Sequence, residues 1–272
     1  MRLIEGLRER VREQVREIGR AVGDNVTDSG QTAVYLRQLF RGNRVPPSVP
    51  ATRSTVGPDA ASTSPPVLLL HGYLATRGSV HLLEQRLTEL GHVVVTYRLG
   101  PLHSGDIRDS AGFIAKKIEC LATQTDVAKV DVVAHSMGGL VALDYLKRLG
   151  GWRRIRRLVL LGTPTQGTWS AVLGLFAAPI GRAGLQLLPG SRFLRELHEI
   201  PLPQGPEVFA VAANRDWLAP RHTTVLPGAR TLTVPTGHSG LLVDETVARA
   251  ISEILSAAPT FQPERGQEPG SA

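Results

Sequence analysis

The sequence predicts a doubly wound, mostly parallel α/β sheet with a helical cap insertion and a helical N-terminal arm. Short apolar runs alternate with segments of helical spacing between residues 66 and 256. These runs are continuous rather than alternating, which is typical of parallel strands covered by helices on both faces. Residues 165–205 interrupt the pattern with a long apolar stretch punctuated by Gly and Pro, where a cap would be inserted.

The expected elements follow one another in an order that fits a single domain. We expect strands at residues 67–70, 93–97, 130–133, 158–161, 208–212 and 231–234. We expect helices at residues 80–90, 107–121, 140–149 and 243–255. A chain of 272 residues, 42% of them hydrophobic, suits one such domain with appendages at both ends.

The N-terminal arm, residues 1–43, is expected to be helical and amphipathic. Apolar residues recur at helical spacing from Leu3 to Val22, and a second, shorter pattern covers residues 32–40. The apolar face of residues 1–22 has no aromatic residue, and its polar face mixes both charge signs. This favours docking on the domain or self-association through residues 1–22 over contact with a membrane surface.

The remaining appendages and the location of the protein are predicted from composition. Residues 44–65 are rich in Pro, Ser, Thr and Ala, which indicates a linker, and residues 257–272 are expected to be a disordered tail. No apolar stretch reaches the roughly 20 residues of a membrane span. The first residues carry several charges and lack the apolar region of a secretory signal. We therefore expect a cytoplasmic protein, with peripheral membrane contact as the alternative.

The net charge of +7 raises the question of an anionic partner. The arginines are scattered, apart from a cluster at residues 153–157 that we expect in a solvated loop before a strand. We therefore expect no nucleic-acid partner. Cys120 is the only cysteine, which excludes an intrachain disulfide and a multi-cysteine metal site. It falls in an expected helix and is interpreted as a small packing residue.

A serine flanked by small residues follows one of the expected strands. Residues 134–139 read Ala-His-Ser-Met-Gly-Gly, directly after the apolar run that ends at Val133 and before a helical stretch. This is the layout of a nucleophile elbow, a sharp strand-to-helix turn that exposes a serine hydroxyl. The turn is crowded, so Ala134 and Gly138 suit the positions two before and two after Ser136. The sequence thus predicts Ser136 as a nucleophile.

A serine hydroxyl needs a base, and the base needs a carboxylate that orients it. His238 follows the last expected strand, so its loop opens at the carboxyl edge of the sheet, where the elbow also lies. It is favoured over His198, in the expected cap, and over His222, which lies close to Asp216 in one loop. Asp216 follows the strand expected at 208–212 and is the favoured acid. The alternatives are Asp144, Asp244 and Glu245.

Two further groups of residues are candidates for the site. The backbone N–H groups of Met137 and Tyr73 are placed to stabilise the oxyanion of a tetrahedral intermediate. His135 is a candidate substrate-binding residue beside the nucleophile. Apolar residues of the expected cap would line an acyl site, or would pack the cap on the core: Trp169, Leu173, Leu175, Phe176, Leu185, Leu187 and Leu188.

Several motifs together resemble the α/β-hydrolase superfamily, and within it bacterial lipases and esterases. They are His71-Gly72, the elbow, Leu161-Gly162-Thr163-Pro164 with Gly167-Thr168, Asp216, and Gly237-His238-Ser239-Gly240-Leu241-Leu242. The likeness covers roughly residues 66–256. It implies Ser136 as nucleophile, His238 as base, Asp216 as acid, the amides of Tyr73 and Met137 as oxyanion hole, and no cofactor or metal.

The function that follows is hydrolysis of a carboxylic ester of lipid or small-molecule type through an acyl-enzyme. The alternative enzymatic function is acyl transfer or thioester cleavage by the same three residues. A non-catalytic hydrolase fold that serves as an interaction module is the third, and the complete set of Ser136, Asp216 and His238 in chain order argues against it.

Overall fold

The computed structural model describes residues 26–41, 64–97, 99, 105–125, 127–170 and 181–258. These residues form a six-stranded sheet in the order β2-β1-β3-β4-β5-β6, and every neighbouring pair of strands is parallel. The strands are β1 (Val67–Leu70), β2 (Val94–Thr96), β3 (Val130–His135), β4 (Ile155–Leu161), β5 (Glu207–Ala213) and β6 (Arg230–Val234). The predicted parallel α/β sheet is confirmed.

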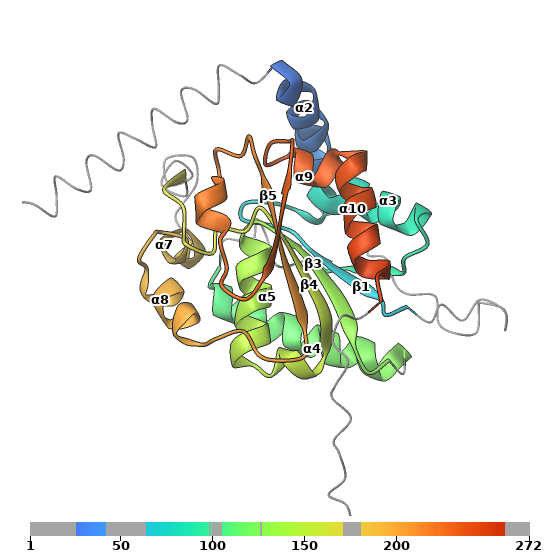
Figure 1. The fold of residues 1–272 in the computed structure, drawn as a ribbon, viewed down its shortest axis with the longest axis vertical. Coiled ribbons are helices and arrows are strands. Elements are labelled where there is room, and N and C mark those ends of the chain that lie inside the picture. The colour runs from blue at the N-terminus through green and yellow to red at the C-terminus, as the bar shows by residue number, and fades with distance from the viewer. Residues whose placement is uncertain are drawn as a thin grey trace, which may run out of the picture.

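Helices cover both faces of this sheet (Figure 1). One face carries α4 (Ile107–Thr125) and α5 (Met137–Arg148), and the other carries α3 (His81–Glu89) and α10 (Glu245–Ser256). Consecutive residues of a strand point to opposite faces, so Leu68 and Leu70 belong to the first core cluster and Val67 and Leu69 to the second. Double coverage explains why the strands read as continuous apolar runs.

Strand β4 begins three residues earlier than the sequence indicates, because its arginines are paired. The Arg157 side chain is 1% exposed, and its Nε lies 2.8 Å from Oε2 of Glu207 on β5. Arg156 forms an ion pair of 2.5 Å with Asp131 on β3. The expectation of a solvated arginine loop is wrong for these two residues, because acids on neighbouring strands compensate their charges.

Cys120 does not pack in the core. It lies in α4 and is exposed, so its interpretation as a packing residue is wrong. The face of α4 that packs on the sheet is formed by Ile114, Ile118 and Leu121, which are buried and recur at helical spacing. Cys120 is two residues after Ile118 and therefore falls on another side of the helix.

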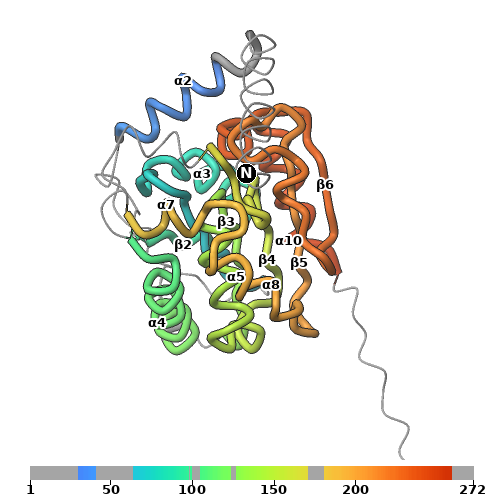
Figure 2. Tube along the Cα trace, turned by 90° about the vertical axis from the view of Figure 1, so that its left-hand side faces the viewer, coloured from blue at the N-terminus to red at the C-terminus, as the bar shows by residue number. Residues whose placement is uncertain are grey.

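The second part of the N-terminal arm forms helix α2 (Val26–Arg41). This helix contacts the 3₁₀ turn η3 (Arg77–Val80) and the short helix α9 (Gly240–Val243). It lies at the end of the molecule near α3, away from α4 (Figure 2). Residues 1–22, most of the expected linker and the expected tail lie outside the described residues.

Two short helices, α7 (Arg182–Gln186) and α8 (Arg192–Glu199), fall within the expected cap. Residues 171–180 of that cap lie outside the described residues. The other described 3₁₀ turns are η4 (Gly151–Arg153) and η5 (Arg221–Thr224). None of the described helices combines the length and the apolar character needed to cross a bilayer.

Candidate active site

Ser136 occupies a strained turn between β3 and α5. Its backbone has φ 53° and ψ −127°, a region that residues with a side chain rarely adopt. On one side of the turn, the Ser136 N–H donates to the Leu161 carbonyl at 2.8 Å. On the other side, the Gly139 N–H donates to the Ser136 carbonyl at 3.0 Å. The backbone therefore presents the side chain at the carboxyl edge of the sheet.

Glycines make room for this turn. A β-carbon at Gly138 would lie 2.6 Å from the carbonyl oxygen of His71, and one at Gly72 would lie 2.9 Å from Cβ of Ser136. Both distances are shorter than any real β-carbon contact, so these positions are restricted to Gly in this arrangement. The loop after β1 and the start of α5 can approach only because neither residue has a side chain.

His238 is paired with Asp216 across two loops at the same edge. The Nδ1 atom of His238 lies 2.6 Å from Oδ2 of Asp216, whose side chain is fully buried. The second carboxylate oxygen accepts the backbone N–H groups of Leu218 at 2.9 Å and Ala219 at 2.7 Å. Three donors thus hold the carboxylate, and it can accept the Nδ1–H proton of His238 and leave Nε2 free to act as a base.

Gly162 lets these two side chains meet. It follows β4 with φ +52°, and a β-carbon there would lie 3.1 Å from both Oδ2 of Asp216 and Nδ1 of His238. A larger residue would therefore press against the hydrogen bond itself. The positive φ and a still closer contact of 2.7 Å with Cδ1 of Leu241 also favour glycine at this position of the Leu-Gly-Thr-Pro motif.

Two neighbouring histidines are kept neutral by burial. Desolvation lowers the pKa of His71 to about 4. It also lowers the pKa of His135 well below its ordinary value, with the nearby His238 acting in the same direction. The ring of His135 lies 4.5 Å from that of His238, and its Nε2 is 3.3 Å from the His238 carbonyl oxygen. A neutral His135 can donate this hydrogen bond without adding positive charge beside His238.

A cavity of about 310 Å³ opens at Ser136 and His238. Its lining comes from several loops and from helix α2: Tyr35, Gly72, Tyr73, Leu74, His135, Ser136, Pro164, Thr168, Ser170, Leu187, Trp217, Leu218, His238 and Ser239. Among these described lining residues there is no Asp, Glu, Lys or Arg. The described part of the lining thus offers no carboxylate, ammonium or guanidinium group.

The two expected oxyanion donors belong to the start of α5 and to the loop after β1. Met137 is the first residue of α5, and the first N–H groups of a helix have no acceptor within the helix. Tyr73 lines the cavity in the loop after β1, and the next residue, Leu74, has the strained value φ 51°. Such strain is common at functional sites. An anion at the Ser136 side chain would face the positive end of α5.

The alternative bases and acids lie away from Ser136: His222 is exposed on η5, and Glu245 forms an ion pair with Arg249. His198 on α8 has its Nε2 atom 2.8 Å from the Thr165 carbonyl oxygen. Asp144 is buried on α5 and lies 3.5 Å from Arg148. Asp244 caps α10 by accepting the N–H groups of Thr246 and Val247. None of these side chains lines the cavity at Ser136.

The expected substrate-binding residues are only partly gathered at the cavity. His135 and Leu187 line it. Trp169 is half-buried and stands outside its described lining, whereas its neighbours Thr168 and Ser170 face it. The side chain of Leu185 is 54% exposed. The candidates Leu173, Leu175 and Phe176 lie outside the described residues.

Sequence reasoning missed two aromatic residues of the cavity. Trp217 is adjacent to Asp216, so its position after the acid could have indicated it. Tyr35 belongs to α2, more than 30 residues before β1 along the chain. No motif marks Tyr35, and only the packing of α2 on the domain brings it to the site.

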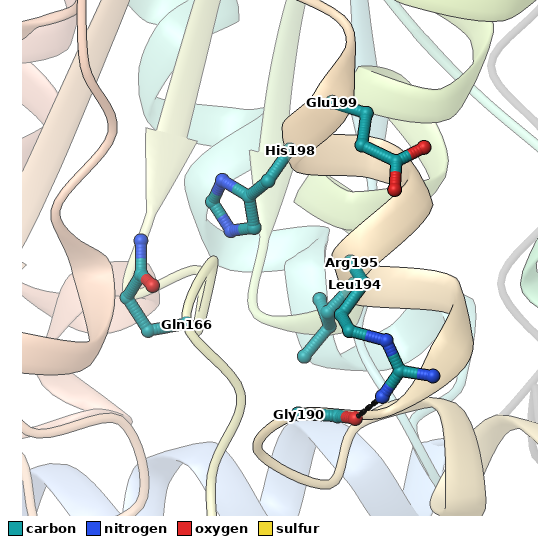
Figure 3. Close-up of a pocket in the computed structure, with 6 residues that line it drawn as sticks. All are labelled: Gln166, Gly190, Leu194, Arg195, His198 and Glu199. Carbon is teal, nitrogen blue, oxygen red and sulfur yellow. Dashed lines mark hydrogen bonds between the residues drawn. The ribbon is translucent and has the colours of Figure 1, made fainter.

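A second, more open cavity of about 540 Å³ lies beside α8 (Figure 3). Its lining residues are Gln166, Gly190, Leu194, Arg195, His198 and Glu199. Arg195 is hydrogen-bonded to the Gly190 carbonyl, and the lining holds no serine or cysteine nucleophile. Across the described residues, no cluster of three or more His, Cys, Asp or Glu side chains could hold a metal ion. The cavity at Ser136 is therefore the candidate active site.

The sequence profile of the alpha/beta hydrolase family matches residues 67–265. The chain belongs to the alpha/beta hydrolase family. The match includes β1, the elbow, Asp216 and His238, and begins after helix α2. The hydrolase fold and the hydrolase class follow from this membership, together with the sheet described above.

Solved structures of lipases and esterases share this fold. A mature lipase from Bacillus licheniformis is 18% identical with a TM-score of 0.64, over 72% of this chain and 94% of that chain. Lipase B of Aspergillus fumigatus is 15% identical with a TM-score of 0.61, over 72% and 53%. An esterase from Exiguobacterium antarcticum is 16% identical with a TM-score of 0.54, over 71% and 92%. At these identities the likeness concerns the fold.

Proposed function

We propose that the protein is a serine hydrolase that cleaves uncharged carboxylic esters through an acyl-enzyme at Ser136. The observation that carries this proposal is the hydrogen bond of 2.6 Å between His238 and the buried Asp216, at the cavity into which the strained Ser136 opens. A serine, a neutral imidazole and an oriented carboxylate are the three parts that acyl transfer requires.

In the first half of the reaction, Nε2 of His238 takes the Ser136 hydroxyl proton while Oγ attacks the ester carbonyl carbon. Asp216 keeps the proton of His238 on Nδ1 and stabilises the imidazolium that forms. The carbonyl oxygen becomes an oxyanion, for which the Met137 and Tyr73 backbone N–H groups are the proposed donors. The carbon–oxygen bond to the alcohol then breaks, and His238 returns its proton to the leaving alkoxide.

In the second half, water replaces the alcohol. His238 removes a proton from this water, whose oxygen attacks the acyl carbon. The bond from the acyl carbon to Oγ of Ser136 then breaks, His238 returns its proton to Oγ, and the acid is released. Among the described contacts, the Ser136 hydroxyl is not hydrogen-bonded to His238. Such bonds often shorten only when substrate is bound, so this geometry is compatible with the proposed roles.

The character of the cavity supports an uncharged ester. Its described lining carries no Asp, Glu, Lys or Arg, and the buried His135 beside it is neutral because desolvation lowers its pKa. Burial of an unpaired carboxylate or ammonium there would be costly. A volume of about 310 Å³ lies at the small end of ligand pockets. The structural neighbours, which are lipases and an esterase, also support an ester substrate.

The test is hydrolysis of p-nitrophenyl esters from acetate to palmitate by the wild type and by Ser136→Ala. We expect p-nitrophenol release by the wild type and loss of at least about a thousandfold in Ser136→Ala, with an unchanged melting temperature. A variant that retained the wild-type rate would contradict the role of Ser136. Transfer of the acyl group to an added alcohol in place of water would identify an acyltransferase instead.

A further inference from the structure

Helix α2 lies outside the family match but takes part in the candidate active site. The match begins at residue 67, whereas α2 spans Val26–Arg41. Tyr35 of this helix nevertheless lines the same cavity as Ser136 and His238. A segment that the hydrolase fold does not require thus supplies a wall of the cavity.

Gln31 connects α2 to the loop that carries His238. Its Oε1 accepts the hydroxyl proton of Thr236 at 2.8 Å, and its Nε2 donates to Oδ2 of Asp244 at 2.9 Å. A β-carbon at Gly240 would lie 2.4 Å from the same Oε1 atom. The Thr236 hydroxyl oxygen would lie closer still, at 1.7 Å, so the glycine leaves room for the hydrogen bond between Gln31 and Thr236.

A second contact holds the other end of α2. The Thr76 hydroxyl donates to the Leu39 carbonyl at 3.0 Å. Thr76 precedes η3, the turn on which α2 also packs. The helix is therefore bonded to the domain before and after Tyr35, and the position of its ring is set by contacts on both sides.

The Tyr35 side chain is fixed by its own packing as well. Its ring packs against the core cluster on the α3 and α10 face of the sheet. Its hydroxyl is hydrogen-bonded to Ser79 of η3, and burial raises its pKa to about 12. The Ser79 hydroxyl donates to the Thr76 carbonyl at 2.7 Å, so the neutral Tyr35 hydroxyl is the donor to Ser79. Tyr35 thus presents a rigid, uncharged aromatic surface to the cavity.

We propose that Tyr35 is a specificity-determining residue, whose ring limits the size of the ester that reaches Ser136. This inference rests on the proposed ester hydrolysis, because it concerns the substrate of the same site. A wall made by one rigid aromatic ring in a cavity of about 310 Å³ excludes longer or bulkier groups. Replacement by a smaller side chain would open that space, and replacement by a larger one would reduce it.

The experiment compares kcat/KM for short and long esters in Tyr35→Ala, Tyr35→Phe and Tyr35→Trp. One ester series varies the acyl chain and a second varies the alcohol. The two series show which part of the substrate is limited in size by Tyr35. We expect the long-to-short ratio of kcat/KM to rise about tenfold in Tyr35→Ala and to fall in Tyr35→Trp. Tyr35→Phe, which keeps the ring, should restore the wild-type ratio.

Phe40→Ala is the matched control, because Phe40 is on α2 but is 83% exposed and is absent from the described cavity lining. It should keep the wild-type ratio. Equal losses for all esters in Tyr35→Ala, with wild-type ratios in the other variants, would overturn the inference and leave Ser136-dependent hydrolysis in place. Absence of Ser136-dependent hydrolysis in the wild type would overturn the proposed function and the inference together.

Discussion

Asp216 has the environment that the proposed role of orienting acid requires. Its carboxylate accepts hydrogen bonds from Nδ1–H of His238 and from two backbone N–H groups of its own loop. An amide in its place would direct an N–H group at His238, or would lose an acceptor for the loop. The first result places His238 in the tautomer that cannot take the Ser136 proton, and the second sets an amide NH2 group against the N–H groups of Leu218 and Ala219.

We therefore expect Asp216→Asn to lower kcat by about 10³–10⁴-fold, in line with the cost of a wrong histidine tautomer. Asp109→Asn is the matched control, because Asp109 lies in the exposed first turn of α4. Steady-state kinetics on a short ester measure the effect. A near-normal kcat in Asp216→Asn would mean that another acid orients His238.

At this scale the sequence was informative where chemistry requires a particular residue type. Chain order and position after a strand made Ser136, Asp216 and His238 the candidates, and the fold brings these three residues to one edge of the sheet. Residues that only shape the cavity belong to no sequence motif that would have indicated them. Tyr35 and Trp217 are aromatic residues without a motif, and their place depends on long-range packing of the loops and α2.

The elbow is an element whose geometry depends on glycine. A β-carbon at Gly138 would meet the backbone oxygen of His71, which cannot move without the loop that carries Tyr73. We expect Gly138→Ala to lower the free energy of unfolding by about 1–3 kcal/mol. Urea unfolding measures this change, and ester turnover should fall with it because the expected oxyanion loop is displaced.

Gly112→Ala is the control for this prediction. Gly112 lies in α4, and no atom is within 4 Å of the position of its β-carbon. Alanine there should raise stability by about 0.5–1 kcal/mol, because a helix interior favours it over glycine. Equal effects of the two substitutions would show that the elbow tolerates a side chain.

Element boundaries were predictable where a strand contains only apolar residues. Strand β1 has the expected bounds, whereas β3 extends two residues further, to His135, and β4 begins at Ile155. Both differences involve polar residues inside strands. Ion pairs such as Arg157 with Glu207 join distant parts of the chain, so a local pattern cannot show that these charges are compensated.

For the whole molecule, the buried histidines predict a loss of stability in mild acid. The pKa of His71 is lowered to about 4, and desolvation also lowers the pKa of His135 and His92. Below pH 6.5 the unfolded chain takes up more protons on these residues than the folded chain does, so the free energy of unfolding falls as the pH falls. Burial raises the pKa values of Asp131 and Asp144, so these carboxylates take up protons in the folded chain first. At the lowest pH values they therefore oppose the loss of stability.

We expect the free energy of unfolding to be about 2 kcal/mol lower at pH 5.5 than at pH 7, since each fully shifted histidine contributes up to about 1.4 kcal/mol per pH unit. Urea titrations at the two pH values, followed by circular dichroism, provide the measurement. A protein equally or more stable at pH 5.5 would show that these histidines take up protons in the folded state.

The central claim is that Ser136 forms a covalent acyl-enzyme, and a covalent label tests it most directly. An alkyl p-nitrophenyl phosphonate transfers its phosphonyl group to an activated serine and releases p-nitrophenol. Mass spectrometry of the digested wild type should find one phosphonyl group per chain, on the peptide that contains Ser136, and Ser136→Ala should remain unlabelled. Equal labelling of Ser136→Ala, or an adduct on another residue, would contradict the account.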